Sequence, residues 1–334
     1  MLKVALLDDY GDVGMGAADW NILDGIAEID VFHEPIPRAR AAEVLRPYDV
    51  LCTIRERTGF PRELLSALPN LKLVTMIGRS LANFDMEAAT ELGIAVVHPG
   101  GFGPDFERAL NATPELTWAL VLASVRNIVR EDKRVRAGLW QHTLGMVLAG
   151  RTLGLLGLGY VGQRVAGYGR AFGMDVIAWS QNLTDDAAAG VGARRVEKHE
   201  LFERADVLSI HVQLSERTRG LVGAHELGLM KPGAHLVNTA RGPIVDEAAL
   251  IAALREGRLA GAGLDVFDHE PLPAGHPLTE LETVTLAPHL GIATPEMLEP
   301  MYRDKPEAIL AYARGAPIRI INPQALEHPR QTGR

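Results

Sequence analysis

The chain has 334 residues, of which 47% are hydrophobic and 23% are charged, as in soluble proteins with two packed domains and unlike disordered or fibrous chains. Its formal net charge of -8 gives no overall positive field for nucleic acid or an anionic membrane, so we expect neither partner. The single cysteine, Cys52, excludes an intramolecular disulfide. Together with an amino terminus that lacks a signal-peptide pattern, it indicates a cytoplasmic protein.

The first block of the chain alternates short apolar strands with amphipathic helical segments. Its five predicted strands lie at 3–8, 28–33, 49–54, 72–76 and 94–97. Glycines and prolines interrupt the pattern at 98–104 and mark a boundary. Repeated strand–helix units of this kind predict a parallel sheet with helices on both faces.

A second block of the same kind follows a long helix, which we predict from 114 to 136. The strands of this block are predicted at 152–156, 175–179, 206–210, 234–238, 260–266 and 283–287. A last helix is predicted over 296–314. We expect the segment after it to return to the first block, which would then be discontinuous.

A glycine-rich turn follows the first strand of the second block. Its pattern is Gly-x-Gly-x-x-Gly, and a helix and another strand come next. In this context the first glycine permits a tight turn, the second lets backbone approach a pyrophosphate, and the third permits close helix packing. The amino end of the helix favours an anion. We therefore expect a dinucleotide to contact Gly157, Gly159, Tyr160, Val161 and Gly162.

The end of the next strand bears on the choice between NAD and NADP. A carboxylate at this position binds the ribose 2′-hydroxyl of NAD, but here Ser180 stands there, followed by Gln181 and Asn182. The missing carboxylate removes a repulsion against a 2′-phosphate, although no arginine follows directly. Arg194 and Arg195 stay open as phosphate partners. The sequence predicts NAD(P)(H), with NADP slightly favoured, and predicts no metal.

Three polar side chains follow separate strands of the second block. They are Arg241, Glu270 and His289. Ligands of a doubly wound sheet bind beyond the carboxyl ends of its strands. A cation, a carboxylate and an imidazole are therefore expected to converge on one crevice, as acid–base chemistry on an anionic substrate requires.

Four ordered motifs identify a relationship. They are the glycine turn, Asn-Thr-Ala-Arg-Gly at 238–242, Leu-Asp-Val-Phe at 264–267 with a following Glu-Pro, and Pro-His-Leu-Gly at 288–291. In this order and spacing the chain resembles the D-isomer-specific 2-hydroxyacid dehydrogenase family, which includes phosphoglycerate dehydrogenases and glyoxylate/hydroxypyruvate reductases. The resemblance covers nearly the whole chain. It implies an NAD(P)-dependent oxidoreductase that transfers a hydride between the nicotinamide and a 2-oxo acid or D-2-hydroxy acid.

The resemblance also implies an α/β architecture of two doubly wound parallel-sheet domains. A dinucleotide-binding Rossmann domain at 111–294 would be inserted in a flavodoxin-like substrate domain made of 1–110 and 295–334. By the same analogy, the chain would form a homodimer through its Rossmann domain.

Residue roles follow from the same resemblance. Arg241 would bind the substrate carboxylate and polarise the 2-oxo group, because a guanidinium presents paired donors. His289 would be the general acid in reduction and the general base in oxidation, with Glu270 orienting it. Further cofactor contacts would come from Thr218, Thr239, Ala240, Asp265 and Gly291.

The substrate side departs from the family's pattern. The family often has a glycine-rich segment before Asn-x-Asp, and here Arg79 and Ser80 replace glycines while Gly78 remains. Arg55 lies after the Cys52 strand, where the family often places a substrate-side residue. We expect substrate contacts from these four residues, with solvated surface charge as the alternative for both arginines. The identity of the acid stays open.

A nucleotide-sensing, corepressor-like binding protein without turnover is the alternative function. Relatives of this family include transcriptional corepressors that retain the catalytic residues. The sequence shows no obvious partner-binding extension or low-complexity arm, which favours the enzyme.

Overall fold

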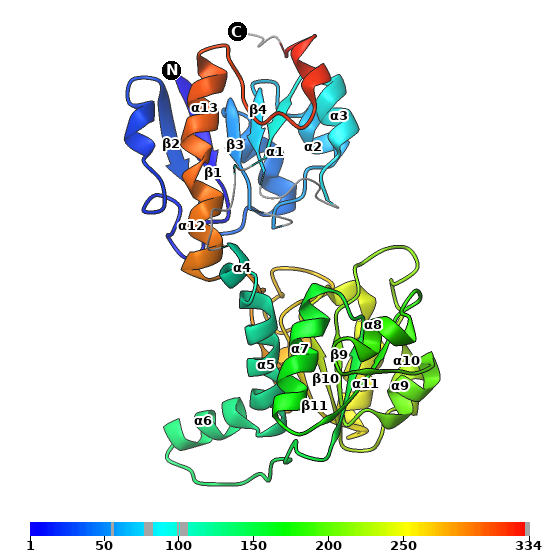
Figure 1. The fold of residues 1–334 in the computed structure, drawn as a ribbon. Helices are drawn as coiled ribbons and strands as arrows, with labels where there is room; N and C mark the ends of the chain where they lie inside the picture. The colour runs from blue at the N-terminus through cyan, green and yellow to red at the C-terminus, as the bar shows by residue number, and fades with distance from the viewer. Residues whose placement is uncertain (55–56, 77–82, 99, 101–105, 331–334) are drawn as a thin grey trace. The chain divides into compact units, whose positions relative to one another are not determined.

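The computed structural model describes the chain apart from residues 55–56, 77–82, 99, 101–105 and 331–334. It divides into two compact units, Met1–Ala109 with Thr294–Arg334 (unit 1) and Leu110–Ala293 (unit 2). Each unit contains one sheet whose named strands all pair in parallel, and helices pack on it (Figure 1). The predicted fold class is therefore confirmed.

Unit 1 has a five-stranded sheet in the order β2-β1-β3-β4-β5, the flavodoxin-like order. The strands are β1 (Leu2–Leu6), β2 (Ala27–Val31), β3 (Val50–Cys52), β4 (Leu73–Thr75) and β5 (Ala95–Val97). Buried side chains of α1 (Ala41–Leu45), α2 (Arg62–Ser66) and α3 (Met86–Glu91) pack with one set of strand residues. Helix α13 (Lys305–Ala313) packs on the sheet beside β4 (Figure 1).

Unit 2 has a seven-stranded sheet in the order β12-β11-β10-β9-β6-β7-β8. Its strands are β6 (Thr152–Leu156), β7 (Asp175–Trp179), β8 (Arg194–Arg195), β9 (Val207–Ile210), β10 (Ala234–Asn238), β11 (Leu259–Leu264) and β12 (Val284–Leu286). The strand order reverses between β6 and β9, and such a reversal opens a crevice at the carboxyl ends of the two strands. The glycine-rich turn directly follows β6.

Helices cover both faces of the unit 2 sheet. One buried cluster joins the sheet to α5 (Ala112–Val125), α7 (Tyr160–Ala171) and α8 (Asp185–Ala189). The other joins it to α9 (Lys198–Arg204), α10 (Ala224–Leu229) and α11 (Glu247–Arg255). Short 3₁₀ turns lie at Trp20–Leu23, Arg38–Arg40, Gly242–Ile244, Pro277–Glu280 and Pro323–Leu326. Among the helices that the structure describes, none is long and apolar enough to cross a membrane.

Two helices that we predicted as continuous are interrupted, so those predictions were wrong. The long helix ends with α5, and α6 (Ile128–Arg136) begins after Asn127, whose φ of 54° leaves the right-handed helical region. The carboxyl-terminal helix consists of α12 (Pro295–Arg303) and α13. Pro306 has no N–H, and its ring would clash with a carbonyl of the preceding turn. The first helix therefore ends before it, and a new helix begins with Pro306 in its first turn. A further short helix, α4 (Phe106–Ala109), precedes unit 2.

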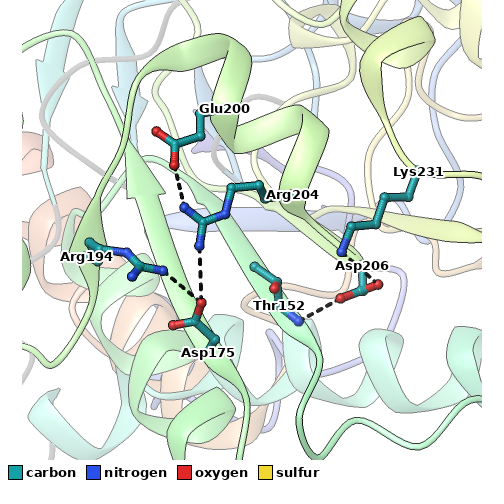
Figure 2. A network of polar contacts seen from close by, with 7 residues as sticks. All are labelled: Thr152, Asp175, Arg194, Glu200, Arg204, Asp206 and Lys231. Atoms are coloured by element: carbon teal, nitrogen blue, oxygen red, sulfur yellow. Dashed lines mark hydrogen bonds and ion pairs between the residues drawn. The ribbon is translucent and has the colours of Figure 1, made fainter.

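Charged side chains connect strand starts of the unit 2 sheet (Figure 2). Asp206, 8% exposed, accepts a hydrogen bond of 2.8 Å from the Thr152 amide and lies 3.1 Å from Lys231. Asp175 instead pairs with Arg194 and Arg204, all with substantial exposure. Asp206 is thus buried and bonded to a backbone amide, whereas Asp175 is exposed and pairs with two arginine side chains.

This difference predicts different contributions to stability. Asp206→Ala should lower the free energy of unfolding by about 1–3 kcal/mol, because it leaves the Thr152 amide without its acceptor. Asp175→Ala should lower it by about 1 kcal/mol or less, since exposed ion pairs contribute little. Urea unfolding followed by circular dichroism compares the two variants. Equal losses of unfolding free energy in the two variants would contradict the larger contribution of Asp206.

His235 in β10 makes stability depend on pH. It is 5% exposed, and its Nδ1 lies 2.8 Å from the hydroxyl of Ser124. Burial lowers the pKa of His235 to about 4. As the pH falls below about 6.5, His235 therefore becomes protonated in the unfolded chain but stays neutral in the folded chain until about pH 4. The contribution of neutral His235 to the free energy of unfolding is therefore fully present above about pH 6.5 and decreases as the pH falls towards 4.

The variant His235→Gln isolates this contribution. We expect wild type to be the more stable at pH 7. Its advantage should shrink by up to about 1.4 kcal/mol per pH unit between about pH 6.5 and 4. Chemical unfolding of both proteins across this range measures the difference. An advantage that stays constant with pH would show that His235 does not titrate in this way.

Candidate functional site

The carboxyl ends of three neighbouring strands in unit 2 carry the predicted polar residues. Arg241 follows β10, Glu270 follows β11 and His289 follows β12, and these strands lie side by side in the sheet. Glu270 contacts His289, and the positive charge of Arg241 lowers the pKa of the Glu270 carboxyl. A cation, a carboxylate and an imidazole are therefore grouped at one edge.

Glu270 and His289 form the tightest polar pair of this edge. The imidazole Nδ1 lies 2.5 Å from Glu270 Oε2, while Glu270 Oε1 accepts the Phe267 amide at 2.9 Å. Burial raises the pKa of the Glu270 carboxyl, but His289, the Phe267 amide and Arg241 outweigh it and hold that pKa below its usual value. An ionised Glu270 only accepts hydrogen bonds, so the Nδ1 of His289 donates. This tautomer leaves Nε2 for a ligand.

Asp265 shapes the turn that carries His289. Its carboxylate accepts the amides of Leu290 at 2.6 Å and Gly291 at 3.0 Å, and its carbonyl accepts the His289 amide at 2.9 Å. His289 has a φ of 54°, a backbone conformation that costs energy for a side-chain-bearing residue. Burial raises the pKa of the Asp265 carboxyl, and the two amides oppose this. These contacts hold the strained turn in place.

This role of Asp265 was not foreseen from the sequence, which associated the residue with the cofactor only. The available signal was the pairing of a buried strand-end aspartate with a Pro-His-Leu-Gly turn after the adjacent strand. The register between β11 and β12 decides whether Asp265 and the turn at His289 come into contact. The spacing of the motifs alone does not give this register. Gly291, also predicted as a cofactor contact, further accepts the hydroxyl of Thr113 through its carbonyl at 2.7 Å.

Arg241 is positioned by a turn built on Asn238. The buried Asn238 side chain accepts the Ala240 amide at 3.0 Å and donates to the Arg241 carbonyl at 3.0 Å. The Arg241 guanidinium donates from Nη1 to the Ala240 carbonyl at 2.6 Å. The Asn-Thr-Ala-Arg-Gly motif thus folds back on itself. It carries a guanidinium beside the Glu270–His289 pair.

The glycine-rich turn has the geometry of a phosphate cradle. Gly157 has a φ of 102°, and a Cβ there would lie 2.8 Å from the His211 backbone. A Cβ on Gly162 would lie 2.3 Å from the Gly157 carbonyl oxygen, whereas one on Gly159 would meet open space. Gly159 caps the amino end of α7, whose first amides lack helical acceptors. Gly157 and Gly162 thus leave no room for a side chain within the turn itself, while the open space at Gly159 and the free amides of α7 fit a pyrophosphate.

A buried polar atom lies beneath this turn. The ring atom Nε2 of His211 is buried and has no hydrogen-bond partner among the residues described. Burial lowers the pKa of His211 to about 3, which keeps the imidazole neutral. The His211 amide donates to the Leu156 carbonyl at 2.7 Å and ties the end of β9 to that of β6. No motif in the sequence marks this residue.

The other predicted cofactor residues have different surroundings. Ser180 is half-buried after β7, while Gln181 and Asn182 are exposed. Tyr160 is 39% exposed, and the guanidinium of Arg164 lies 3.5 Å from its ring centre. Each of these side chains lies after the carboxyl end of β6 or β7.

Two of the threonines are occupied within the protein. The hydroxyl of Thr218 donates to the Gln213 carbonyl at 2.6 Å and accepts the Ser215 amide at 2.8 Å. The hydroxyl of Thr239 is 2.7 Å from that of Thr117 and is buried. Both side chains therefore stabilise loops at the carboxyl edge of the sheet.

The predicted substrate residues Arg55, Gly78, Arg79 and Ser80 lie outside the described residues. Nearby in unit 1, Arg57 donates to the Asp8 carbonyl at 2.6 Å and its guanidinium lies 4.6 Å from the ring centre of Tyr10. Thr58 donates to the Asp8 carboxylate at 2.7 Å. These contacts tie the segment after β3 to the end of β1.

Three side chains in unit 1 have the spacing of metal ligands. Ligand atoms of Asp9, Asp12 and His33 lie within 4.8 Å of one another. The Asp9 carboxylate already accepts the amides of Val13 and Gly14 at 3.0 and 2.9 Å, so its oxygens serve the local loop. We assign no metal to this group.

Comparison with known proteins gives consistent matches. A family model described as "D-isomer specific 2-hydroxyacid dehydrogenase, NAD binding domain" matches residues 118–291. A glyoxylate reductase of Aeropyrum pernix is 40% identical over 305 residues, covering 88% of this chain and 89% of that protein.

Solved structures agree with these sequence matches. A phosphoglycerate oxidoreductase of Vibrio cholerae is 35% identical with a TM-score of 0.85, over 95% of this chain and 100% of that one. A D-lactate dehydrogenase of Aquifex aeolicus, solved with NAD and lactic acid, is 25% identical with a TM-score of 0.71, over 99% of each chain.

Proposed function

The chain belongs to the D-isomer specific 2-hydroxyacid dehydrogenase family, and from this premise we propose that it interconverts a 2-oxo acid and a D-2-hydroxy acid by hydride exchange with NAD(P)(H). One observation carries the proposal. The imidazole of His289 lies 2.5 Å from the Glu270 carboxylate, within the influence of the Arg241 charge. This group offers a proton donor and an anion-binding cation at a single edge of the sheet.

Arg241 would hold the substrate. Its guanidinium can bind a carboxylate through two parallel hydrogen bonds and polarise the adjacent carbonyl. The turn around Asn238 fixes the backbone that presents it. Reduction places negative charge on the carbonyl oxygen, and a nearby guanidinium favours that charge.

His289 would move the proton. During reduction, Nε2 protonates the substrate oxygen, and during oxidation it removes the proton of the hydroxyl. Glu270 accepts from Nδ1 and so fixes the tautomer and the orientation of the His289 ring. Asp265 would act through the backbone of the turn. The chemistry that a bound nicotinamide supplies is the exchange of a hydride with substrate C2.

The two units would divide the work. Unit 2 would bind the dinucleotide at the glycine-rich turn, where the backbone cradle supports a pyrophosphate. Unit 1 would supply substrate contacts from the segments after its strands. NADP would be favoured over NAD because Ser180 replaces the carboxylate that would repel a 2′-phosphate.

Glyoxylate is the first substrate to test. It is the substrate that the name of the Aeropyrum pernix relative specifies. The Vibrio cholerae and Aquifex aeolicus structures carry names with larger 2-hydroxy acids. All of these share a carboxylate next to the reacting carbon, which is the group that Arg241 would bind.

A turnover assay tests the proposed function. Purified protein would be mixed with glyoxylate, hydroxypyruvate, pyruvate and bulkier 2-oxo acids, while the absorbance of NADH or NADPH is followed. We expect oxidation of the cofactor with at least one acid and its loss in His289→Asn. Tight cofactor binding without turnover on any acid would contradict the proposal and favour a nucleotide-sensing protein.

An exposed apolar segment of unit 2 supports the homodimer. Leu144 is 87% exposed, Trp140 79% and Val147 74%, all after α6. Large apolar side chains gathered in this way mark an interaction surface. We propose that a second copy of the chain covers them.

The dimer makes a direct prediction. The double variant Trp140→Asp, Leu144→Asp should shift the protein from dimer to monomer in size-exclusion chromatography with light scattering, since charges would enter an apolar interface. Ile22→Asp, which alters a 38% exposed apolar residue of unit 1, should leave the dimer intact. A wild type that stays monomeric at micromolar concentration would contradict the proposal.

A further inference from the structure

The structure separates the two arginines that the sequence left as phosphate partners. Arg194 and Arg195 form β8, but their side chains bond at different places. Arg194 donates to Asp175 at 2.9 Å, and Asp175 is the first residue of β7 (Figure 2). It is therefore engaged at the amino edge of the sheet, away from the carboxyl ends where a dinucleotide binds.

Arg195 is engaged at the opposite edge. In register it pairs with Ala178, the last residue but one of β7. Its Nε donates to the carbonyl of Leu183 at 3.0 Å, in the loop that begins with Ser180. The guanidinium is thus hydrogen-bonded to the loop that begins with Ser180. In NAD-binding proteins, the first residue of this loop binds the adenine ribose.

The remaining donors of Arg195 are available for exchange. Nη2 contacts Glu197 at 3.0 Å, and the side chain of Glu197 is 61% exposed. No acceptor contacts Nη1 among the residues that the structure describes. An exposed ion pair of this kind is weak, so Glu197 can return to water at little cost. A phosphate with more charge and three acceptor oxygens would then bind the guanidinium more strongly.

We propose that Arg195 binds the 2′-phosphate of NADP(H) and sets the cofactor preference of this protein. Binding would replace the Glu197 carboxylate by the phosphate, while the Leu183 carbonyl keeps the guanidinium at the loop. Ser180 leaves the site free of a competing carboxylate. The inference rests on the proposed function, because it assumes that the glycine-rich turn binds the rest of the dinucleotide.

Fluorescence titration with NADPH and NADH tests the inference without any turnover. Wild type should bind NADPH about tenfold more tightly than NADH. Arg195→Ala should weaken NADPH binding by about 10- to 100-fold, the range for a hydrogen-bonded charge, with NADH binding unchanged. Arg194→Ala, the matched control, should change neither. Glu197→Gln should tighten NADPH binding, because it removes the competing carboxylate, an effect that loss of loop structure would not produce.

The outcomes distinguish a failure of the proposed function from a failure of the assignment of Arg195. If wild type binds neither cofactor, the proposed function fails and the inference fails with it. If wild type binds NADH as tightly as NADPH or more tightly, the NADP preference is wrong. If wild type prefers NADPH and Arg195→Ala retains that preference, the assignment of Arg195 is overturned while the proposed function stands. If Arg195→Ala weakens both cofactors equally, its role is structural and the assignment is likewise overturned.

Discussion

Replacing His289 by asparagine should lower kcat for the reduction of a 2-oxo acid by about 10²–10⁴-fold, the usual loss of a general acid–base group. Asparagine keeps a donor near Glu270 but cannot release a proton to the substrate oxygen. NADPH binding should stay within about twofold of wild type, since the glycine-rich turn is separate in sequence from the Pro-His-Leu-Gly turn. Steady-state kinetics with glyoxylate and a parallel fluorescence titration measure both quantities.

A neighbouring histidine gives the control for this variant. His269 is exposed and directly precedes Glu270 in the chain, but the Glu270 carboxylate pairs with His289. His269→Asn should therefore retain nearly full activity. If His269→Asn were the inactive variant and His289→Asn were active, the assignment of the acid–base group would be wrong.

Arg241→Lys should reduce kcat/KM by about 30- to 5000-fold, because losing one partner of a hydrogen-bonded charge pair costs about 2–5 kcal/mol. Lysine preserves the positive charge but not the planar fork that holds a carboxylate and a carbonyl together. The loss in kcat/KM should appear mainly as a higher KM, with a smaller change in kcat. Kinetics over a wide range of glyoxylate concentrations separate KM from kcat.

The matched control for Arg241 is Arg219→Lys. Arg219 is an exposed residue of unit 2, so this exchange should change kcat/KM by less than about twofold. A similar loss in both variants would show that the effect is not specific to the proposed carboxylate-binding position. Full activity of Arg241→Lys would remove Arg241 from that role.

The fold was largely predictable because its signals are local. Alternating strand and helix patterns located both parallel sheets, and the turn at Gly157 identified the strand that starts the second one. Breaks within helices were not predicted, because Asn127 adopts a left-handed conformation that its residue type permits but does not demand. The two-residue strand β8 was also missed, since two residues cannot show a period.

The candidate site was predictable to the extent that strand ends carry it. Parallel strands all end at one edge, so Arg241, Glu270 and His289 could be expected near one another. The contacts of Asp265 with the turn at His289 depend on strand register, and those of Arg195 depend on side-chain direction. Neither quantity follows from the spacing of motifs. Only the three-dimensional structure distinguished Arg195 from Arg194.

Transfer of deuterium from the cofactor to the substrate tests the central claim most directly. The protein would be incubated with glyoxylate and NADPH deuterated at one or the other C4 position, and glycolate would be analysed by mass spectrometry and NMR. We expect deuterium at C2 of glycolate from only one of the two cofactor isomers, and labelled glycolate should form about 10²–10⁴-fold more slowly when His289→Asn replaces wild type. Glycolate without deuterium from either isomer would contradict direct hydride transfer.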